Sequence, residues 1–308
     1  MCMLTERDII ARLIDARALF RRIHVIMQRF DVIPSDRDHI GAYIEYTDLQ
    51  EMREEFLSEL LNSIVDWVYS SEKYNRLHKQ AIEAGRSPSS AASEIYRKAK
   101  AKFRGSNQGE SLVSQGQFGE LLLFAFIQKC MKAVPLLRKM PITTSTKHER
   151  FGADAIHFKF EDNQPIIVIG EAKTYTKKYG FSEAFYKSIN SILDTYEKHR
   201  QELDLYVHED FLDREMDEIA ESYLEGTLKN FRIDLVCIIT YNENKMIEKT
   251  EEKKIRYQIE RIIDERYGSI DKSKIDIEKN PILSRITYIV FPVWELEKLI
   301  EEFQNQLR

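Results

Sequence analysis

The chain has 308 residues, of which 43% are hydrophobic and 31% charged, and its formal net charge is −5. This is the composition of a soluble globular protein, and the acidic balance excludes a uniformly basic nucleic-acid binder, so any contact with DNA or RNA requires a local basic patch. No apolar run approaches the roughly 20 residues that a membrane-spanning helix needs. Three widely spaced cysteines without a C-x-x-C pair, and no visible signal peptide, favour a reducing cytoplasm and no zinc site.

The first hundred residues are predicted to be mainly helical. The spacing of their apolar residues predicts helices over 1–30 and about 49–70, with a strand at 40–46 between them. The stretch 84–93 is rich in small residues and contains a proline, which predicts a linker. We therefore expect a mainly helical N-terminal region at 1–105, with a regulatory or docking role, and a second domain at 106–308.

The second part alternates more regularly between helices and strands. Helices are predicted at 111–133, 182–205, 209–228, 247–266 and from 294 to the end, and strands at 153–160, 166–169, 233–239 and 285–291. The turn residues Asp162 and Asn163 would join the first two strands into a hairpin. The strand at 166–169 is too apolar to face water, so we expect it to be central. This order indicates an α/β or mixed α+β fold, with a small central mixed sheet flanked by helices.

A carboxylate and an ammonium follow the most apolar predicted strand, in the sequence Gly170-Glu171-Ala172-Lys173. If the strand continues through them, Glu171 and Lys173 point to the same side of the sheet, because side chains alternate along a strand. The pair would then lie at the end of a buried strand.

Three further E-x-K sequences begin at Glu243, Glu251 and Glu252, so the pattern alone is a weak signal. The last two lie in a charge run that is typical of a solvated segment. Glu243 with Lys245 is the serious alternative because it also follows an apolar strand. However, it is surrounded by turn residues, and no acidic residue precedes it on a hairpin partner, so we prefer Glu171.

Asp154 supports this preference, because it stands at the start of the preceding strand. In an antiparallel hairpin with its turn at 162–164, Asp154 lies opposite residues near 172. Cross-strand neighbours are about 5 Å apart, so the carboxylates of Asp154 and Glu171 could share one cation. Gly152 and Gly170 flank these acids, and we expect them to let a phosphate backbone approach closely.

Glu120 is the third acidic candidate, on the predicted helix before the hairpin. It lies among apolar residues, where an unpartnered carboxylate is costly and a metal ion would compensate it. Two or three carboxylates with waters and a phosphate oxygen form a hard oxygen site that suits Mg²⁺, or Mn²⁺. Such a metal polarises a scissile phosphate and activates water, and Lys173 would position or deprotonate the attacking water.

At these residues the sequence resembles the PD-(D/E)xK nuclease superfamily and, more narrowly, the HamA family, the nuclease component of Hachiman anti-phage defence systems. The matching stretches are 117–122 (QFGELL), 151–158 (FGADAIHF), 169–175 (IGEAKTY) and 180–184 (GFSEA). Ala153 stands where the motif has proline. The resemblance implies a restriction-endonuclease-like core and a Mg²⁺-dependent deoxyribonuclease whose catalytic residues are Glu120, Asp154, Glu171 and Lys173.

The resemblance also implies partners for the chain. A separately encoded, HamB-like helicase would form a complex with the nuclease and hold it inactive until foreign or damaged DNA is sensed. No Walker A motif G-x-x-x-x-G-K-[ST] occurs here, so the chain is not itself the motor. DNA is the expected substrate, and we expect no contact with a membrane.

Alternatives remain open for each of these features. The four candidate residues could be a structural salt-bridge cluster. The chain could also be a non-catalytic DNA-binding or scaffold subunit that keeps the nuclease fold. A third alternative is a protein-interaction module that uses the N-terminal helices. Lys177 and Lys178, just past the candidate site, are predicted to contact phosphates. The basic run 97–104 is either a solvated helix face or a nucleic-acid contact. The histidines suit no zinc site: His157 is predicted to be half-buried in a strand, and His148, His199 and His208 to lie at the surface.

Overall fold

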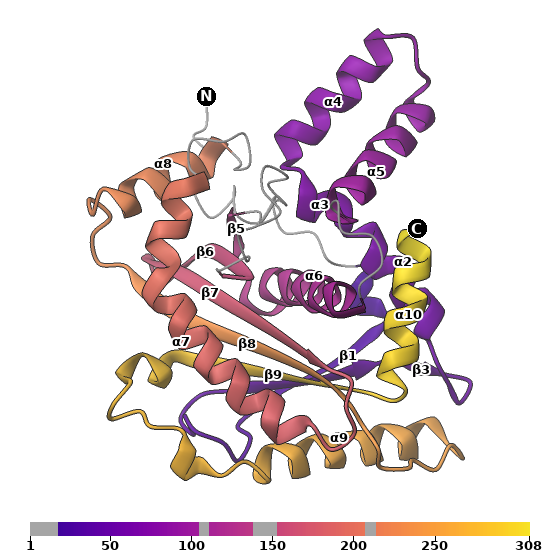
Figure 1. Cartoon of the computed structure of the whole chain (residues 1–308), viewed down its shortest axis with the longest axis vertical. Helices are drawn as coiled ribbons and strands as arrows, with labels where there is room; N and C mark the ends of the chain where they lie inside the picture. Colours follow the sequence, from indigo (N-terminus) through magenta and orange to yellow (C-terminus); the bar gives the residue numbers. More distant parts are fainter. Residues whose placement is uncertain (1–17, 105–110, 138–152, 207–213) are drawn as a thin grey trace.

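A seven-stranded mixed sheet runs through the computed structural model, which describes residues 18–104, 111–137, 153–206 and 214–308. In the order of the sheet its strands are β1 (Ile23–Gln28), β2 (His39–Ile44), β9 (Ile286–Val293), β8 (Arg232–Asn242), β7 (Gln164–Tyr175), β6 (Ala155–Glu161) and β5 (Val134–Leu137). The four strands from β2 to β7 are parallel, and the strands outside them pair antiparallel. This confirms the predicted mixed α/β class (Figure 1).

Helices cover both faces of this sheet. They are α2 (Arg53–Asn62), α3 (Ile64–Val68), α4 (Ser71–Glu83), α5 (Pro88–Arg104), α6 (Ser111–Met131), α7 (Phe181–Tyr206), α8 (Arg214–Leu224), α9 (Glu252–Gly268) and α10 (Leu296–Leu307). Residues of α7, α8 and α9 join one hydrophobic cluster with the sheet, whereas residues of α2, α5, α6 and α10 join another. None of the described helices combines the length and apolar character needed to cross a bilayer.

Strand β7 lies between these two clusters, which explains its apolar sequence. Ile167 and Ile169 belong to the cluster of α7, while Ile166 and Val168 belong to the cluster of α6. All four side chains are fully or almost fully buried, because a parallel strand covered by helices has no solvated face. The prediction that this strand is interior is confirmed, although β8 holds the middle of the strand order.

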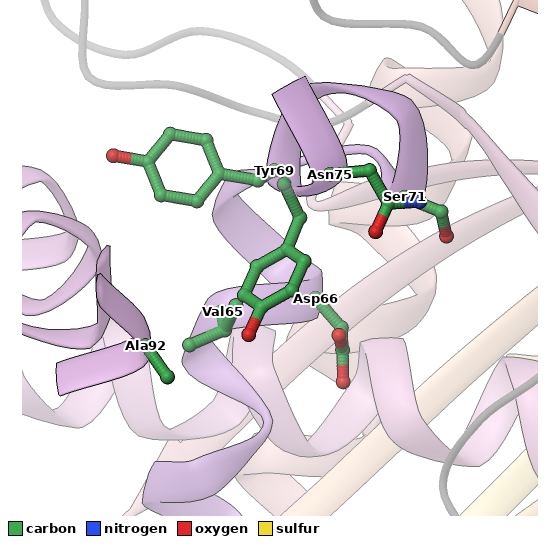
Figure 2. A pocket seen from close by; sticks show the side chains of 7 residues that line it. Val65, Asp66, Tyr69, Ser71, Asn75 and Ala92 are labelled. Carbon is green, nitrogen blue, oxygen red and sulfur yellow. The ribbon is translucent and has the colours of Figure 1, made fainter. Parts of the chain in front are cut away.

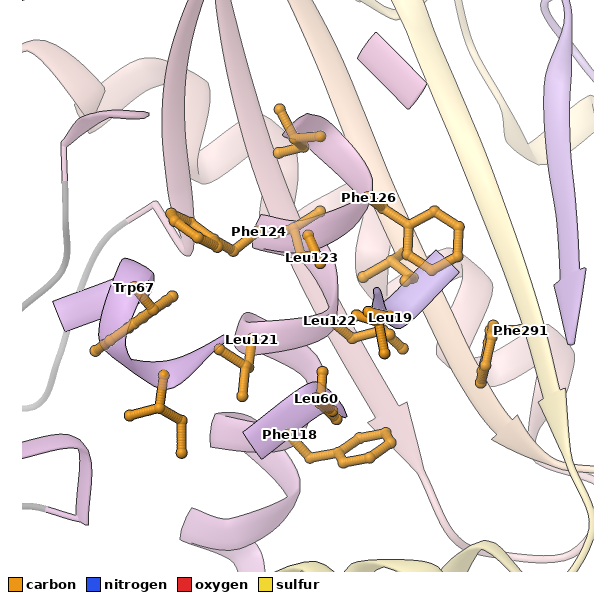
Figure 3. Packing of buried hydrophobic residues seen from close by; sticks show 14 of the residues in the cluster. Leu19, Leu60, Trp67, Phe118, Leu121, Leu122, Leu123, Phe124, Phe126 and Phe291 are labelled. Atoms are coloured by element: carbon orange, nitrogen blue, oxygen red, sulfur yellow. The ribbon is translucent and has the colours of Figure 1, made fainter. Parts of the chain in front are cut away.

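The buried face of α6 packs against the sheet and against α10. Phe126 of α6 contacts Phe291 of β9 edge-on at a ring distance of 6.1 Å, and Phe118 contacts Phe303 of α10 at 5.4 Å. Figure 3 shows these side chains of α6 directed toward the sheet and its neighbouring helices. Burying a large apolar side chain contributes about 1.5–3 kcal/mol, so this layer holds α6 firmly beside β7.

The helix predicted over 1–30 is wrong where the structure describes it. Residues 1–17 lie outside the described part, Leu19–Arg21 form one 3-10 turn, and Ile23–Gln28 form β1. The apolar residues at 23, 26, 27 and 30 fit a helical spacing, but this segment pairs antiparallel with β2 and contains the β-branched residues Ile23, Val25 and Ile26, which suit a strand.

Two further N-terminal predictions are corrected. The predicted linker 84–93 is only a turn, because α5 begins at Pro88, a residue well suited to the first turn of a helix, and buries Ala91. The helix predicted over 49–70 is divided into the short strand β4 (Gln50–Glu51), which pairs with β3 (Tyr46–Thr47), and the helices α2 and α3. The strand predicted at 40–46 is confirmed as β2.

Both sides of the predicted boundary near residue 105 share the same sheet. Strand β2 pairs in parallel with β9, with Ile40 opposite Ile289. Each hydrophobic cluster also contains residues from before and after the boundary. A division at 105 remains a prediction, but it would cut through a continuous sheet.

Candidate functional site

The β6–β7 hairpin brings the first two candidate residues together. Its turn, Asp162-Asn163, has left-handed backbone angles, φ 49° and 65°, as in the two-residue turns that match the twist of paired strands. Ala155, the first residue of β6, is opposite Gly170, and Asp154 directly precedes it. The predicted hairpin is confirmed, and it brings Asp154 to the segment near residue 172, as expected.

Two hydrogen bonds, one from a backbone amide and one from a side chain, hold the two carboxylates in place. Oδ2 of Asp154 accepts a hydrogen bond from the amide of Ala172 at 2.9 Å. Nζ of Lys173 donates to Oε1 of Glu171 at 2.8 Å. Asp154, Glu171 and Lys173 therefore form one cluster, here called the acidic pair and its lysine.

Two hydroxyl groups of α7 complete the surroundings of Glu171. Ser191 donates to Oε1 at 2.6 Å and Thr195 donates to Oε2 at 3.2 Å. Glu171 is only 4% exposed, so each of its oxygens is satisfied by a donor, as a buried carboxylate requires. The sequence prediction missed both hydroxyls. The available signal was a serine and a threonine four residues apart on the apolar stripe of the predicted helix 182–205.

Burial and the neighbouring charges both shift the pKa values of the cluster. Burial, and then the nearby carboxylate of Asp154, raise the pKa of Glu171 despite the opposing effect of Lys173. Burial alone would lower the pKa of Lys173, but the Glu171 carboxylate raises it above its usual value. Lys173 is therefore an ammonium at neutral pH, bonded to the Glu171 carboxylate.

Glu120 lies on α6, which covers the other face of the sheet from α7. It is half-buried on α6, next to Gly119, where an added Cβ would lie 3.2 Å from the Cβ of Ala172. Helix α6 thus covers the face of β7 that carries Ala172, whereas Glu171 points to α7. Among the described residues no three His, Cys, Asp or Glu side chains are grouped to hold a metal ion. A site made of Glu120, Asp154 and Glu171 is therefore not assembled here, and the role of Glu120 stays a prediction.

The acidic pair by itself fits a hard divalent cation. Mg²⁺ is commonly bound through one or two carboxylates, with waters and substrate phosphates as the other ligands. The Asp154 carboxylate contributes, after burial, to the raised pKa of Glu171, so the two carboxylates lie close enough to interact. The donor set is oxygen only, which suits Mg²⁺ or Mn²⁺ and not zinc.

Gly170 has a different role from the expected one. An added Cβ would lie 2.8 Å from Cδ1 of Ile127 and 3.0 Å from Cδ2 of Leu123, both on α6. Gly170 therefore lets α6 pack closely on β7 and faces no open approach for a phosphate. Gly152, the other glycine predicted to flank the acids, lies outside the described residues.

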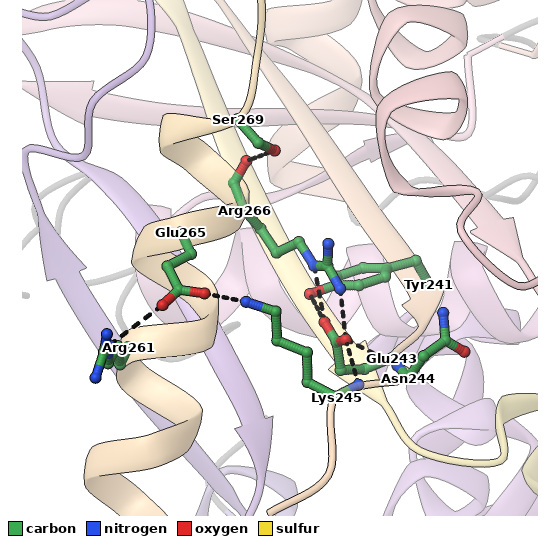
Figure 4. A network of polar contacts seen from close by, with 8 residues as sticks. All are labelled: Tyr241, Glu243, Asn244, Lys245, Arg261, Glu265, Arg266 and Ser269. Carbon is green, nitrogen blue, oxygen red and sulfur yellow. Dashed lines mark hydrogen bonds and ion pairs between the residues drawn. The ribbon is translucent and has the colours of Figure 1, made fainter.

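Glu243, the alternative E-x-K acid, is part of a structural ion-pair network (Figure 4). It is 2% exposed, and Arg266 donates to both its oxygens at 2.9 and 2.5 Å. Tyr241 and the backbone amides of residues 244 and 245 donate to it as well. Burial would raise the pKa of Glu243, but these donors, Arg266 first, lower it. Lys245 turns away to Glu265, so this carboxylate and lysine do not act together.

The segment after β7 exposes two candidate phosphate ligands. Lys177 and Lys178 are exposed, and Tyr179 beside them is 85% exposed with a left-handed φ of 59°. Gly180 ends this turn against the ring of Tyr175. A larger residue would not fit there, because an added Cβ would overlap that ring. The two lysines are placed past the end of the strand that carries Glu171, as predicted, while their contact with phosphate remains a prediction.

The predictions for two histidines are corrected. His157 is fully buried in β6, with its ring edge-on to Phe124 at 5.4 Å, because β6 is covered by α6. His199 was expected at the surface but is buried on α7, where its ring bonds to the hydroxyl of Tyr223. The length of α7 and its packing against α8 bury this histidine. His148 and His208 lie outside the described residues.

A separate hollow of about 380 Å³ lies between α3, α4 and α5 (Figure 2). Its lining residues are Val65, Asp66, Tyr69, Ser71, Tyr74, Asn75 and Ala92. One carboxylate and two phenol rings are not a catalytic set of acids, so this hollow is no rival to the acidic pair.

Comparison with known proteins identifies the family. The HamA family model matches residues 23–307, nearly the whole chain, including Asp154, Glu171 and Lys173. The match also includes β1, β2 and the helices up to α5, and it confirms the resemblance to the HamA family. No curated protein matches the chain. The chain therefore belongs to the HamA family, whose members are components of Hachiman defence systems.

Proposed function

We propose that the chain is a metal-dependent DNA nuclease with a restriction-endonuclease-like core, acting as the effector of a Hachiman system. The observation that supports this most directly is that Asp154 is bonded to the Ala172 amide at the end of the β6–β7 hairpin, between Glu171 and Lys173, while Lys173 is bonded to Glu171. Two carboxylates and a lysine brought together at the end of a hairpin are the chemical parts of a PD-(D/E)xK site.

Asp154 and Glu171 would hold a Mg²⁺ or Mn²⁺ ion, with Glu120 as a further candidate ligand. When bound, such an ion polarises the scissile phosphate and lowers the pKa of a bound water. Ser191 and Thr195 keep the Glu171 carboxylate in one orientation, and the Ala172 amide does the same for Asp154. Ligand geometry is thereby fixed before the substrate arrives, as efficient catalysis requires.

Lys173 would act as a cation and not as a base. Its pKa is raised by Glu171, so the ammonium keeps its proton at neutral pH. It can donate a hydrogen bond to the attacking water or to a phosphate oxygen, and it adds positive charge where the transition state is negative. Of the two roles expected from the sequence, we retain positioning of the water. Lys177 and Lys178 would bind the phosphates that flank the scissile one.

We further propose that a separately encoded, HamB-like helicase binds this nuclease and restrains it. Family membership supports a system with several components, since HamA belongs to a defence system. The chain has no Walker A motif of its own. A helicase that senses DNA would therefore supply the trigger.

The test is cleavage of plasmid DNA with Mg²⁺ by the full chain, alone and with the helicase encoded beside it. Glu171→Gln and Lys173→Met should each lower the cleavage rate by at least about a hundredfold, the magnitude expected for removing a preorganised charged group. Glu243→Gln, which changes the same residue type in the other E-x-K sequence, serves as the matched control and should cleave normally. If Glu171→Gln and Lys173→Met cleaved at the wild-type rate, as the control does, the site assignment would be disproved.

A non-catalytic DNA-binding or scaffold subunit is the second candidate function. It is favoured by the bonds of Glu171 to Lys173, Ser191 and Thr195, which also stabilise a buried carboxylate without a metal. This alternative predicts DNA or helicase binding without strand scission at any Mg²⁺ or Mn²⁺ concentration, with or without the helicase.

A further inference from the structure

Helices α4 and α5 form a hairpin that projects from the body of the molecule (Figure 1) and is here called the arm, residues 71–104. The arm contains nine lysines and arginines but three acidic residues, which gives it a net charge of +6. Because the whole chain carries −5, the remainder carries −11. The arm is therefore a positive element on a negative protein.

Only one side of the arm packs against the hydrophobic core. Helix α5 buries a row of residues four apart, Ala91, Ile95, Ala99 and Phe103, and the Phe103 ring packs edge-on against Trp67. Helix α4 has no buried residue at all. Its amphipathic sequence contributes little to the core, so packing alone does not account for the residues that it exposes.

The basic side chains gather on the exposed surface of the two helices. Those that are exposed on the arm include Arg76, Lys79, Arg86, Arg97, Lys98 and Lys102. Three of these six have acidic partners: Glu83 lies 3.9 Å from Lys79, and Glu94 pairs with Lys98 and Arg86. Exposed pairs of this kind hold their partners weakly, so the basic groups can exchange to another anion.

Like charges also meet where the two helices join the body. Partial burial, and then the ammonium of Lys73 on α4, lower the pKa of Lys102 on α5. Lys102 lies over the ring of Tyr69, 5.1 Å from its centroid. Figure 2 shows Tyr69 and Asp66 at this base. The positive charge of the arm therefore extends from its exposed helices to this base.

The base of the arm is connected to the strand of the acidic pair. Nε2 of Gln117 on α6 donates to the backbone carbonyl of Phe103 at 2.5 Å. Two residues later, Gly119 packs on Ala172, between Glu171 and Lys173. The arm thus extends from the helix that supports the candidate site.

We propose that the arm binds the phosphate backbone of duplex DNA through the exposed basic side chains of α4 and α5, without reading its sequence. Helix α4 has 13 residues. At about 1.5 Å per residue it is about 20 Å long, enough to follow about six base pairs. This inference extends the proposed function to a second DNA contact, and it does not require that the chain cleaves DNA.

The experiment measures binding of a fluorescent 20-base-pair duplex to the full chain in EDTA, where no metal-dependent cleavage interferes. The arm variant is Arg76→Gln/Lys79→Gln/Arg97→Gln/Lys98→Gln. The control is Lys229→Gln/Lys253→Gln/Lys279→Gln/Lys298→Gln, which removes the same charge from four exposed lysines elsewhere. The arm variant should lose about tenfold or more in affinity, and its slope of log K against log salt should fall by up to about 3–4.

The paired variants Arg76→Gln/Lys79→Gln and Arg97→Gln/Lys98→Gln, each confirmed to unfold at the wild-type temperature, should each show part of this loss. An arm variant that binds DNA as the control does, with the same salt slope, would overturn the proposal. The proposal would also be overturned if the arm variant bound DNA normally but lost affinity for an acidic protein partner. That result would assign the arm to the partner. Absence of nuclease activity would leave this result standing, because binding is measured without metal.

Discussion

The backbone amide of Ala172 donates a hydrogen bond to Oδ2 of Asp154 at 2.9 Å. Because this amide lies between Glu171 and Lys173 in the chain, the aspartate that precedes β6 is tied to the segment that carries the other two groups. The orientation of Asp154 therefore depends on strand register, and register here is set by a two-residue turn and a largely buried partner strand.

Ser191→Ala should lower cleavage by about tenfold, because a hydrogen bond to a buried carboxylate is worth about 1.5 kcal/mol or more. The serine lowers the pKa of Glu171, so its loss should also shift the acidic limb of the rate–pH profile to higher pH. Ser188→Ala, which removes another buried hydroxyl of α7 that bonds to the Phe185 carbonyl, is the control. A rate loss without a shifted pH profile would mean that Ser191 only supports the fold.

Binding of Mg²⁺ to the free protein should weaken as pH falls. The pKa of Glu171 is raised by burial and by Asp154, so its proton must be displaced by the metal at acidic pH. The increase in unfolding temperature produced by Mg²⁺ should therefore be larger at pH 8 than at pH 5. Glu171→Gln should abolish the increase at both values. A shift of equal size in wild type and in this variant would place the metal elsewhere.

Glu243→Gln should reduce the free energy of unfolding by about 2 kcal/mol at neutral pH, because it leaves Arg266 without its charged partner. The pKa of Glu243 is lowered in the folded protein, so this stabilisation is present above the ordinary value of 4.5 and is lost as pH falls through the lowered pKa. Urea titrations at pH 7 and pH 3.5 measure this.

The control for that change is Glu265→Gln, which breaks the exposed pair with Lys245 in the same network and should alter stability little. If Glu243→Gln were instead to abolish cleavage while leaving stability intact, the choice of Glu171 as the catalytic glutamate would be contradicted.

Gly119→Ala should destabilise the protein, since the added Cβ would lie 2.6 Å from Oγ1 of Thr174 and 3.2 Å from Ala172. Gly116→Ala, three residues earlier on the same helix, meets no atom within 4 Å and should stabilise by up to about 1 kcal/mol through helix propensity. Thermal unfolding compares the two. Combining Gly119→Ala with Thr174→Ala should recover part of the loss, and failure to recover any would show that the clash is with Ala172 alone.

The hairpin of the candidate site could be predicted from the sequence because its signals are local. Asp162-Asn163 marks the turn, and the alternation of residues before it and the apolar run after it indicate paired strands. Counting outward from the turn then places Asp154 near Glu171. The family match later confirmed the resemblance carried by the same residues.

The environment of Glu171 could not be predicted in the same way. Ser191 and Thr195 reach it from a helix twenty residues later, and only the packing of α7 on β7 brings them together. The N-terminal strand β1 could not be predicted from apolar spacing, because Ile23, Ile26 and Phe30 recur at helical steps, whereas the pairing with β2 makes the segment a strand. The buried His199 likewise depends on α8, whose position no local pattern reveals.

The pairing of β2 with β9 has a consequence for synthesis and turnover of the chain. Ile40 and Ile289, which lie opposite each other, are separated by most of the polypeptide, so closing the loop between them costs conformational entropy. A nascent chain released before β9 is made leaves β2 with an open hydrogen-bonding edge, which favours aggregation or proteolysis. Incomplete translation would therefore yield a fragment with an unfinished sheet and not a stable shortened protein.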